Sequence, residues 1–275
     1  MTTSERVAEI ERMAFRAFPA EIEKRRGDWT LRATRLASNR RVNSATTPLR
    51  RAGDLAADLD AIERFYVALR RDPLLRVLSA SPDAIDTAAA GRGYETEAET
   101  LVMVRTIGAT GAPPATVPSS PGSAWLDAKA AWTPMSSESI EGWLGRITAI
   151  PGSAGFASIR DEAGVVAIGM GVVDGGWLGI FDVNTRPDAA GIQPDARGRG
   201  HATSVTATII DWGVSQGAGA AYLQVMNGNE PALRLYRAAG FEESYRYWYR
   251  RAPAGADRYS ATSFSWPHVG HCHGT

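Results

Sequence analysis

The sequence contains only one cysteine, Cys272, so the chain has no pair with which to form an internal disulfide. Small secreted domains usually depend on several disulfides, and a lone cysteine is typical of a protein from a reducing compartment. Long apolar runs are also missing. No run of about eighteen apolar residues occurs, and the N-terminal stretch lacks the apolar core of a signal peptide. We therefore expect a cytoplasmic protein with no membrane span.

An excess of charge of one sign is likewise missing, because 30 Lys and Arg residues balance 30 Asp and Glu residues. General nucleic-acid-binding proteins carry a basic excess, so we predict no nucleic-acid partner. Residues 245–250 alternate tyrosines with arginine and tryptophan, a pattern that a base-stacking surface can also show. At strand spacing the pattern predicts instead one buried face formed by Tyr245, Tyr247 and Tyr249.

Metal ligands and catalytic nucleophiles are scarce. The last eight residues gather His268, His271, Cys272 and His273, but their spacing is not that of a structural zinc site. We predict no bound metal, and we interpret residues 256–275 as a surface tail. No Ser-His-Asp arrangement is visible, and no internal cysteine is available as a nucleophile.

What the sequence does contain is enough apolar material for a sizeable core, since 44% of its residues are hydrophobic. Residues 108–124 are rich in Gly, Pro, Ser and Ala and lack apolar periodicity, which is typical of a linker. We predict one domain over residues 1–107 and a second over residues 125–255. In the first, the patterns of residues 28–36 and 40–45 indicate two strands around a turn.

The two parts resemble each other when the first is shifted by 147 positions. Helix, strand, helix, a Gly-aromatic pair and a strand then follow in the same order in both. The matched pairs are Ile62 and Ile209, Phe65 and Trp212, Leu78 and Val225, Gly93 and Gly240, and Tyr94 and Phe241. Two interpretations stay open, a duplicated fold or an accidental match of apolar patterns.

The stretch 197–202, Arg-Gly-Arg-Gly-His-Ala, directly precedes an apolar run at helical spacing. The first N–H groups of a helix have no intrahelical acceptor and carry the positive end of the helix dipole, so phosphates bind there. Glycines let the backbone approach an anion closely, and the two arginines add charge. The stretch therefore fits a pyrophosphate, although it equally fits a plain helix start with solvated arginines. It is neither a nucleotide-hydrolysing P-loop nor a good dinucleotide fingerprint.

The context resembles the GNAT superfamily of acyl-CoA-dependent acyltransferases. The pattern Arg197-x-x-Gly200-x-Ala202 is similar to the superfamily's pyrophosphate loop, and it lies between a strand and a helix. A second signature resembles the downstream part of the superfamily, with an asparagine after a strand, a tyrosine on the next helix and then Gly-Phe. Its members here are Asn229, Ala232, Tyr236, Gly240 and Phe241. The resemblance covers roughly residues 125–252.

This resemblance implies an α+β fold with two GNAT-like domains, each a mostly antiparallel central sheet flanked by helices. It implies direct transfer of an acetyl group from acetyl-CoA to an amine, with Tyr236 as the general acid that protonates the leaving thiolate. The residues that it implies for binding the cofactor are Asp182, Val183, Thr185, Arg197, Gly198, Arg199, Gly200, His201, Ala202, Thr203, Asn229 and Ala232. A backbone N–H near Asp182 and Val183 is expected to stabilise the negative charge on the thioester oxygen.

Two departures from the superfamily pattern stand out. Residues 176–178 hold no carboxylate at the place where several relatives carry their general base, and Asp182 lies at the other end of that strand. We therefore favour a water chain or bulk solvent as the proton acceptor. The distance from Val183 to Arg197 is 14 positions, against 8 from Val42 to Arg50, so the second part carries about six extra residues. They leave open which residues, 181–185 or 191–193, bind the pantetheine arm.

By the 147 offset, Arg197, Gly200 and Ala202 of the loop correspond to Arg50, Gly53 and Leu55. Tyr236 corresponds to Ala89, and Asn229 corresponds to Pro82. We therefore expect the first domain to be a degenerate GNAT-like domain without catalytic capacity. The expected acceptor is a small-molecule amine or a peptide N-terminus, in a monomer or a homodimer. The alternative is a non-catalytic protein that binds acyl-CoA or a partner.

Overall fold

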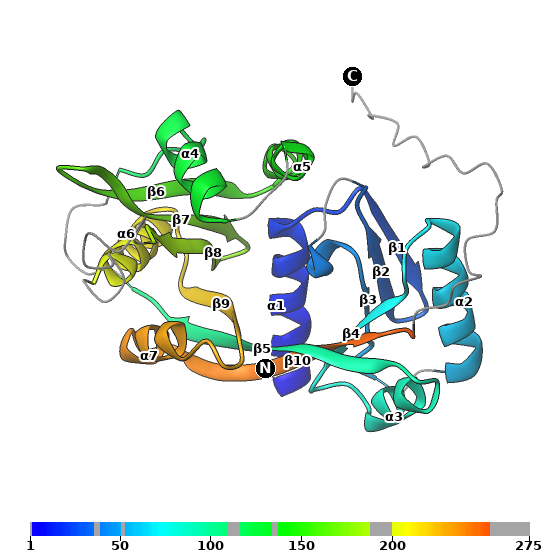
Figure 1. The fold of residues 1–275 in the computed structure, drawn as a ribbon. Coiled ribbons are helices and arrows are strands. Elements are labelled where there is room, and N and C mark those ends of the chain that lie inside the picture. Colours follow the sequence, from blue (N-terminus) through cyan, green and yellow to red (C-terminus); the bar gives the residue numbers. More distant parts are fainter. Residues whose placement is uncertain are drawn as a thin grey trace, which may run out of the picture. The chain divides into compact units, whose positions relative to one another are not determined.

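The computed structural model describes residues 2–35, 39–50, 53–108, 116–133, 137–187 and 200–253. The chain forms two compact units (Figure 1). Unit 1 takes residues 1–8, 19–100 and 245–275, and unit 2 takes residues 9–18 and 101–244. The predicted domain boundaries at residues 107 and 125 stay predictions. Each compact unit also contains a piece from the other end of the chain.

Unit 1 holds a mostly antiparallel sheet with the strand order β1-β2-β3-β4-β10, in which only β3 and β4 pair in parallel. Helix α1 runs through residues of both units. The elements are α1 (Thr3–Ala17), β1 (Ile22–Arg26), β2 (Trp29–Ala33), the 3-10 helix η1 (Arg40–Val42), β3 (Ala45–Thr46), α2 (Leu55–Ala68), β4 (Leu74–Leu78), α3 (Asp83–Gly91) and β5 (Glu95–Thr106).

Unit 2 repeats this plan with longer strands in the order β5-β9-β8-β7-β6, in which β8 and β9 pair in parallel and β7 pairs antiparallel with β6 and β8. The elements are α4 (Ser123–Trp132), α5 (Ser137–Ile147), β6 (Ser153–Asp161), β7 (Gly164–Asp174), β8 (Trp177–Thr185), α6 (His201–Ser215), β9 (Ala220–Met226), α7 (Glu230–Ala238) and β10 (Glu242–Arg251). The predicted α+β fold class is confirmed.

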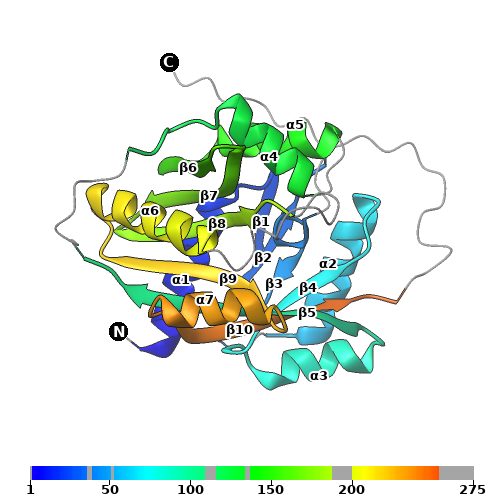
Figure 2. The ribbon, with the colours of Figure 1, turned by 60° about the vertical axis from the view of Figure 1, so that its left-hand side comes forward.

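The second part of each repeat follows the predicted offset closely. Helix α3 begins at 83 and α7 at 230, and the two end at 91 and 238, so both differences are 147. Strands β5 and β10 begin at 95 and 242, again 147 apart. Yet β10 pairs with β4 in unit 1, and β5 is the neighbour of β9 in unit 2 (Figure 2). Each repeat therefore gives its last strand to the sheet of the other.

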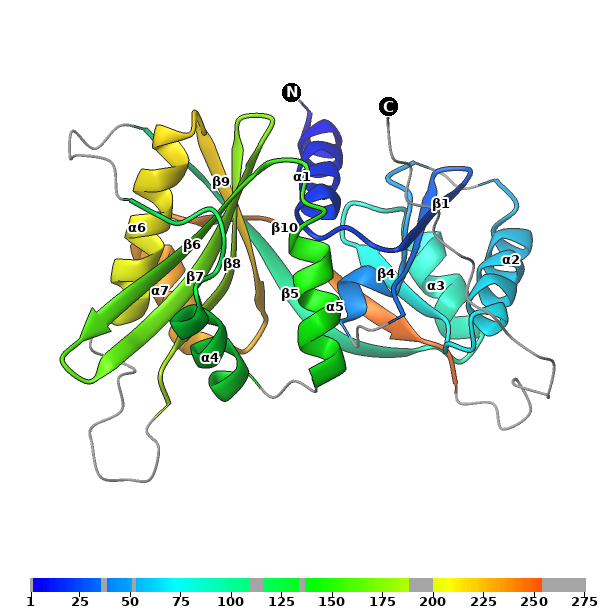
Figure 3. The same ribbon diagram turned by 90° about the horizontal axis from the view of Figure 1, so that it is seen from above.

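Helices cover both faces of the sheet in unit 2. Helix α6 and helix α4 lie on opposite faces of β7 and β8 (Figure 3). Glycines make the approach of α6 possible, because a Cβ atom at Gly171 would come within 2.8 Å of Trp212, and one at Gly169 within 2.6 Å of Ile209. Consecutive residues of β7 are accordingly buried on both sides. This close packing holds the start of α6 at one end of the strands.

The prediction of a strand over residues 40–45 is wrong for the first half of this range. Residues Arg40–Val42 form a 3-10 turn, and only Ala45–Thr46 pair as a strand. The Asn39 side chain explains the difference, since its Oδ1 accepts from the Arg41 N–H at 2.9 Å and starts the turn. The buried tyrosine face is confirmed, with Tyr245, Tyr247 and Tyr249 all buried along β10.

Candidate active site

Strands β8 and β9 part from each other inside unit 2. Their parallel ladder runs from Trp177 and Ala220 to Ile180 and Leu223 and ends there. Strand β8 nevertheless continues to Thr185, and β9 continues to Met226. Backbone groups at strand edges that have parted need other partners, because N–H and C=O groups are strong hydrogen-bonding groups. The edge of β8 after Ile180 is therefore available to a ligand that brings amide groups of its own.

A β-bulge lies in the same stretch of β8, in its pairing with β7. Ile168 of β7 faces Asn184, and Met170 faces Phe181, so Asp182 and Val183 together face only Gly169. Asp182 adopts a φ of +52°, in the left-handed region. A residue other than glycine pays about 1 kcal/mol for that conformation, and Asp is one of the residues that tolerate it best. A bulge of this kind turns the backbone out of the ladder and re-aims its polar groups.

Two side chains hold the bulge in this conformation. The Lys129 ammonium of α4 forms an ion pair with Asp182, with Nζ 3.0 Å from Oδ1. The Asn184 Nδ2 donates to the Asp182 carbonyl oxygen at 3.0 Å. Lys129 is only 6% exposed, and its Nζ lies 5.3 Å from the ring centre of Trp143. The other carboxylate oxygen, Oδ2, is buried and accepts no hydrogen bond from the part of the chain that the structure describes.

Helix α6 begins without a side-chain cap. Its N-cap residue is Gly200, with a φ of +82°, and no acidic residue lies in the first turn. The N–H groups of His201, Ala202 and Thr203 have no acceptor within the helix, so the turn favours an anion. His201 and Ala202 are half-buried and Thr203 is exposed. The remaining residues of the predicted pyrophosphate loop, Arg197, Gly198 and Arg199, lie outside the described residues.

The predicted acid Tyr236 lies on α7 with 8% of its surface exposed. Burial raises the pKa of its phenol to about 12. Its ring packs edge-on against Phe241, with the ring centres 6.0 Å apart. A phenol with this pKa is protonated at neutral pH, as a general acid must be.

Asn229 and Ala232 form the start of helix α7. The Asn229 Oδ1 accepts from the Ala232 N–H at 3.3 Å and caps the helix, and Ala232 packs against the core of unit 2. The cap gives Asn229 a structural task that the sequence reasoning did not foresee. The predicted contacts of both residues with a cofactor stay predictions.

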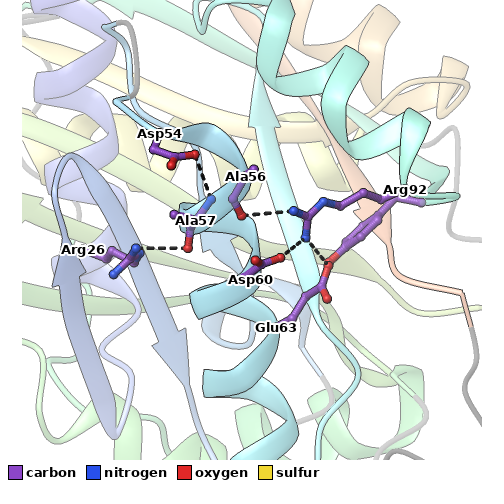
Figure 4. A network of polar contacts seen from close by, with 8 residues as sticks. Arg26, Asp54, Ala56, Ala57, Asp60, Glu63 and Arg92 are labelled. Carbon is purple, nitrogen blue, oxygen red and sulfur yellow. Dashed lines mark hydrogen bonds and ion pairs between the residues drawn. The ribbon is translucent and has the colours of Figure 1, made fainter.

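The corresponding helix start in unit 1 is built differently (Figure 4). Helix α2 is capped by Asp54, whose Oδ1 accepts from the Ala57 N–H at 3.0 Å. Arg26 donates to the Ala57 carbonyl oxygen at 3.0 Å, and Arg92 donates to the Ala56 carbonyl oxygen at 3.0 Å. The first turn of α2 thus has its own carboxylate, and two arginines bind carbonyl oxygens of the same turn.

A protein family described as "Probable histone acetyltransferase Rv0428c C-terminal" matches residues 3–250. The chain belongs to this family. The chain is therefore an acetyltransferase of the GNAT type. As a member, the chain uses an acyl-CoA in general and takes an amine as acceptor.

Several individual proteins are similar to this chain. "Uncharacterized N-acetyltransferase YobR" of Bacillus subtilis is 28% identical over 252 residues, which cover 89% of this chain and 98% of that protein. A solved structure, "GCN5-related N-acetyltransferase from Kribbella flavida", has a TM-score of 0.62 at 17% identity and covers 90% of this chain and 96% of its own. A functionally unknown conserved protein of Staphylococcus epidermidis has a TM-score of 0.54 at 10% identity, covering 84% of this chain and 93% of its own. The two structures show the fold alone.

The predicted site residues that the structure describes fall on three elements of unit 2. Asp182, Val183 and Thr185 lie on β8. Gly200–Thr203 open α6, and Asn229, Ala232 and Tyr236 belong to α7 or its cap. Lys129 was missed by the sequence reasoning. Its rarity is the signal that would have found it, because only two of the 30 basic residues outside histidine are lysines, Lys24 and Lys129.

Other kinds of site find little support in the described ranges. They contain no group of three or more His, Cys, Asp or Glu residues that could hold a metal ion, while the four ligand-type residues of the tail lie outside them. No helix among them is both long and apolar enough to cross a membrane. A cavity of about 540 Å³ in unit 2 is lined in part by Ile147, Trp212 and Gln216, and no predicted site residue borders it.

Proposed function

We propose that unit 2 transfers an acetyl group from acetyl-CoA to an amine by direct attack. One observation carries this proposal. Strands β8 and β9 part after Ile180 and Leu223, and within the same unit α6 begins with a bare glycine cap and no acid. An open strand edge and an anion-binding helix start are the two features that an extended ligand with a pyrophosphate at one end requires.

The two ends of the donor have separate places in this arrangement. The pyrophosphate of coenzyme A binds at the first turn of α6, where the N–H groups of His201, Ala202 and Thr203 donate to phosphate oxygens. Arg197 and Arg199 of the preceding stretch add positive charge. The pantetheine arm bears amide groups, and these pair with the free edge of β8 between Phe181 and Thr185. The thioester then lies beside the bulge at Asp182.

The reaction needs three groups in turn. The amine nitrogen attacks the thioester carbonyl carbon, a C–N bond forms, and negative charge develops on the carbonyl oxygen. A bulge N–H near Asp182 and Val183 donates a hydrogen bond to that oxygen. The C–S bond then breaks, and Tyr236 gives its proton to the leaving thiolate.

The proton of the attacking amine leaves to solvent through water. No carboxylate stands at residues 176–178, where relatives place a base. The Asp182 carboxylate is already paired with Lys129 at 3.0 Å, which occupies one of its two oxygens. This assignment predicts how the turnover rate depends on pH. The rate should rise with the deprotonated fraction of the acceptor amine and should not follow the titration of any group of the enzyme.

The acceptor is a primary amine, either a small molecule or a peptide N-terminus. The description of the matching family names histone acetylation, which makes a peptide amine a natural first substrate to test. Release of free coenzyme A is measured after mixing the protein with acetyl-CoA and a panel of small amines and peptides. We expect release with at least one acceptor and a matching mass gain of the product. Binding of acetyl-CoA without release by any acceptor contradicts catalysis.

A further inference from the structure

Lys129 is an unusual residue in this chain. The sequence uses arginine for nearly every positive charge, and its two lysines are Lys24 and Lys129. Lys24 is exposed on β1, as a charged residue normally is, whereas Lys129 is only 6% exposed in α4. Burial of an ammonium is unfavourable unless the charge is paired. The interior of unit 2 therefore has to supply Lys129 with a partner.

The partner is the carboxylate at the bulge of β8. Lys129 Nζ lies 3.0 Å from Asp182 Oδ1 and 5.3 Å from the ring centre of Trp143. Trp143 itself stacks on Trp125 with the ring centres 5.4 Å apart and the planes 13° from parallel. The ammonium is thus held between an aromatic wall and Asp182. A compact charge with three donors fits between them, and the larger planar guanidinium of arginine is not equivalent to it.

This ion pair acts on the strained backbone of the bulge. Asp182 has a φ of +52°, and Asp182 and Val183 share one opposing residue, Gly169. The carboxylate is fixed by Lys129, and the carbonyl oxygen is fixed by Asn184 at 3.0 Å. With both groups held, the peptide plane that carries the bulge N–H groups has a defined direction. Without the ammonium, the half-buried Asp182 carboxylate would lose its ion pair and could turn toward solvent, which would move the bulge.

We propose that Lys129 is a positioning residue for acyl transfer, whose ion pair with Asp182 keeps the bulge N–H groups aimed at the thioester oxygen. This inference rests on the proposed function of unit 2. Lys129 itself touches neither the donor nor the acceptor. Its effect therefore falls on the rate of transfer rather than on the affinity for acetyl-CoA.

Three variants separate positioning from ordinary stabilisation. Lys129→Met removes the charge but keeps the length of the side chain, and Lys129→Met combined with Asp182→Asn also removes the carboxylate left behind. Lys24→Met is the matched control on an exposed lysine. Melting temperature, the dissociation constant for acetyl-CoA, and kcat and KM for the best acceptor are measured for each.

We expect kcat of Lys129→Met to fall at least tenfold, with the acetyl-CoA dissociation constant within about twofold of the starting protein. The double variant should recover the melting temperature, because no unpaired, half-buried carboxylate remains, yet its kcat should stay at least tenfold low. Lys24→Met should change nothing. If Lys129→Met does not fold, the double variant alone carries the test.

Recovery of kcat together with the melting temperature in the double variant overturns the inference, since the pair would then be structural only. A loss of acetyl-CoA affinity as large as the loss of kcat overturns it as well. A starting protein that releases no coenzyme A with any acceptor contradicts the proposed function instead, and that result is seen before any variant is made.

Discussion

The two units share a plan and differ at the two places where a donor would bind. In unit 1 the parallel pairing of β3 and β4 ends at Thr46 and Arg76, and Arg76 corresponds to Leu223 because 223 − 76 is 147. There the hydrogen bonding goes on, since the Thr47 N–H donates to the Arg76 carbonyl oxygen at 3.1 Å. The Leu78 N–H then donates to Thr47 Oγ1, also at 3.1 Å. Unit 1 thus continues the hydrogen bonding between its two parallel strands past the position at which the ladder of unit 2 ends.

The helix starts differ in the same sense. Asp54 caps α2 at the position that corresponds to His201, because 201 − 54 is 147. A carboxylate that already accepts from the first turn fills the place of an anion and repels another one. In unit 2 the cap is a glycine that offers no acceptor. A duplicated fold can therefore lose ligand binding by satisfying its own backbone, without any change of topology.

The largest effect is expected from Tyr236→Phe, which gives unit 2 the same lack of an acid as unit 1, where Ala89 stands at the corresponding position. The variant cannot protonate the thiolate, so we expect kcat to fall about 100-fold. The acetyl-CoA dissociation constant should hardly change. Stopped-flow or coupled assays of coenzyme A release measure kcat, and calorimetric titration measures the acetyl-CoA dissociation constant. An unchanged kcat removes Tyr236 from the mechanism.

The same tyrosine predicts an alkaline effect on stability. Burial raises the Tyr236 pKa from 10.0 to about 12. The unfolded chain therefore loses this proton first, and the free energy of unfolding falls as the pH rises from 10 toward 12. The two pKa units amount to about 2.7 kcal/mol. Denaturant unfolding of the starting protein and Tyr236→Phe at pH 8 and pH 11.5 should show a smaller alkaline loss in the variant. Equal losses would mean that the phenol is not buried.

In unit 1, Thr47→Val tests whether the closed strand edge is structural. The Thr47 hydroxyl accepts from Leu78 and lies 2.6 Å from Ser81 Oγ, and all of these groups are buried. Loss of the hydroxyl leaves two buried partners unsatisfied, so we expect the free energy of unfolding to fall by about 2 kcal/mol. Acetyl transfer at a temperature well below the transition should stay the same. A fall in kcat larger than twofold would assign unit 1 a part in the reaction.

His201→Asp gives the first turn of α6 a carboxylate, one residue after its N-cap Gly200, as the start of α2 has one in Asp54. A carboxylate in the first turn of α6 competes with the pyrophosphate, so we expect acetyl-CoA to bind about tenfold more weakly, with a smaller difference at high salt. His201→Asn is the matched control, because its side chain has the same shape as that of Asp but carries no charge. Equal weakening in both variants would show that the imidazole, and not the charge, matters.

The sequence predicts the parts of this molecule that follow from local pattern. The offset of 147 places α3 on α7 residue for residue, since apolar spacing and the Gly-aromatic pair specify these helices. Helix α6 also begins at the place where the motif predicts a helix start. What the pattern does not contain is pairing between distant residues. The contact of Lys129 with Asp182 joins a helix to a strand 53 positions away (182 − 129), and no periodicity encodes it.

Two details of the backbone also escaped the sequence. The bulge at Asp182 depends on how β7 and β8 register, with one glycine facing two residues. The 3-10 turn at Arg40–Val42 depends on a single amide side chain, that of Asn39, which outweighs the strand propensity of the residues that follow. The bulge is set by the pairing of two strands. The 3-10 turn is set by a side chain that competes with the strand for a backbone N–H group.

The exchange of β5 and β10 makes the sheet of each repeat depend on the presence of the other repeat. A gene cut at the boundary between them would yield a first product whose sheet ends at β4 and a second whose β9 has lost its neighbour β5. Loss of either repeat would therefore also remove a strand from the sheet of the other, whatever chemistry each repeat performs. Once a duplicated protein has crossed its strands in this way, neither copy can be discarded.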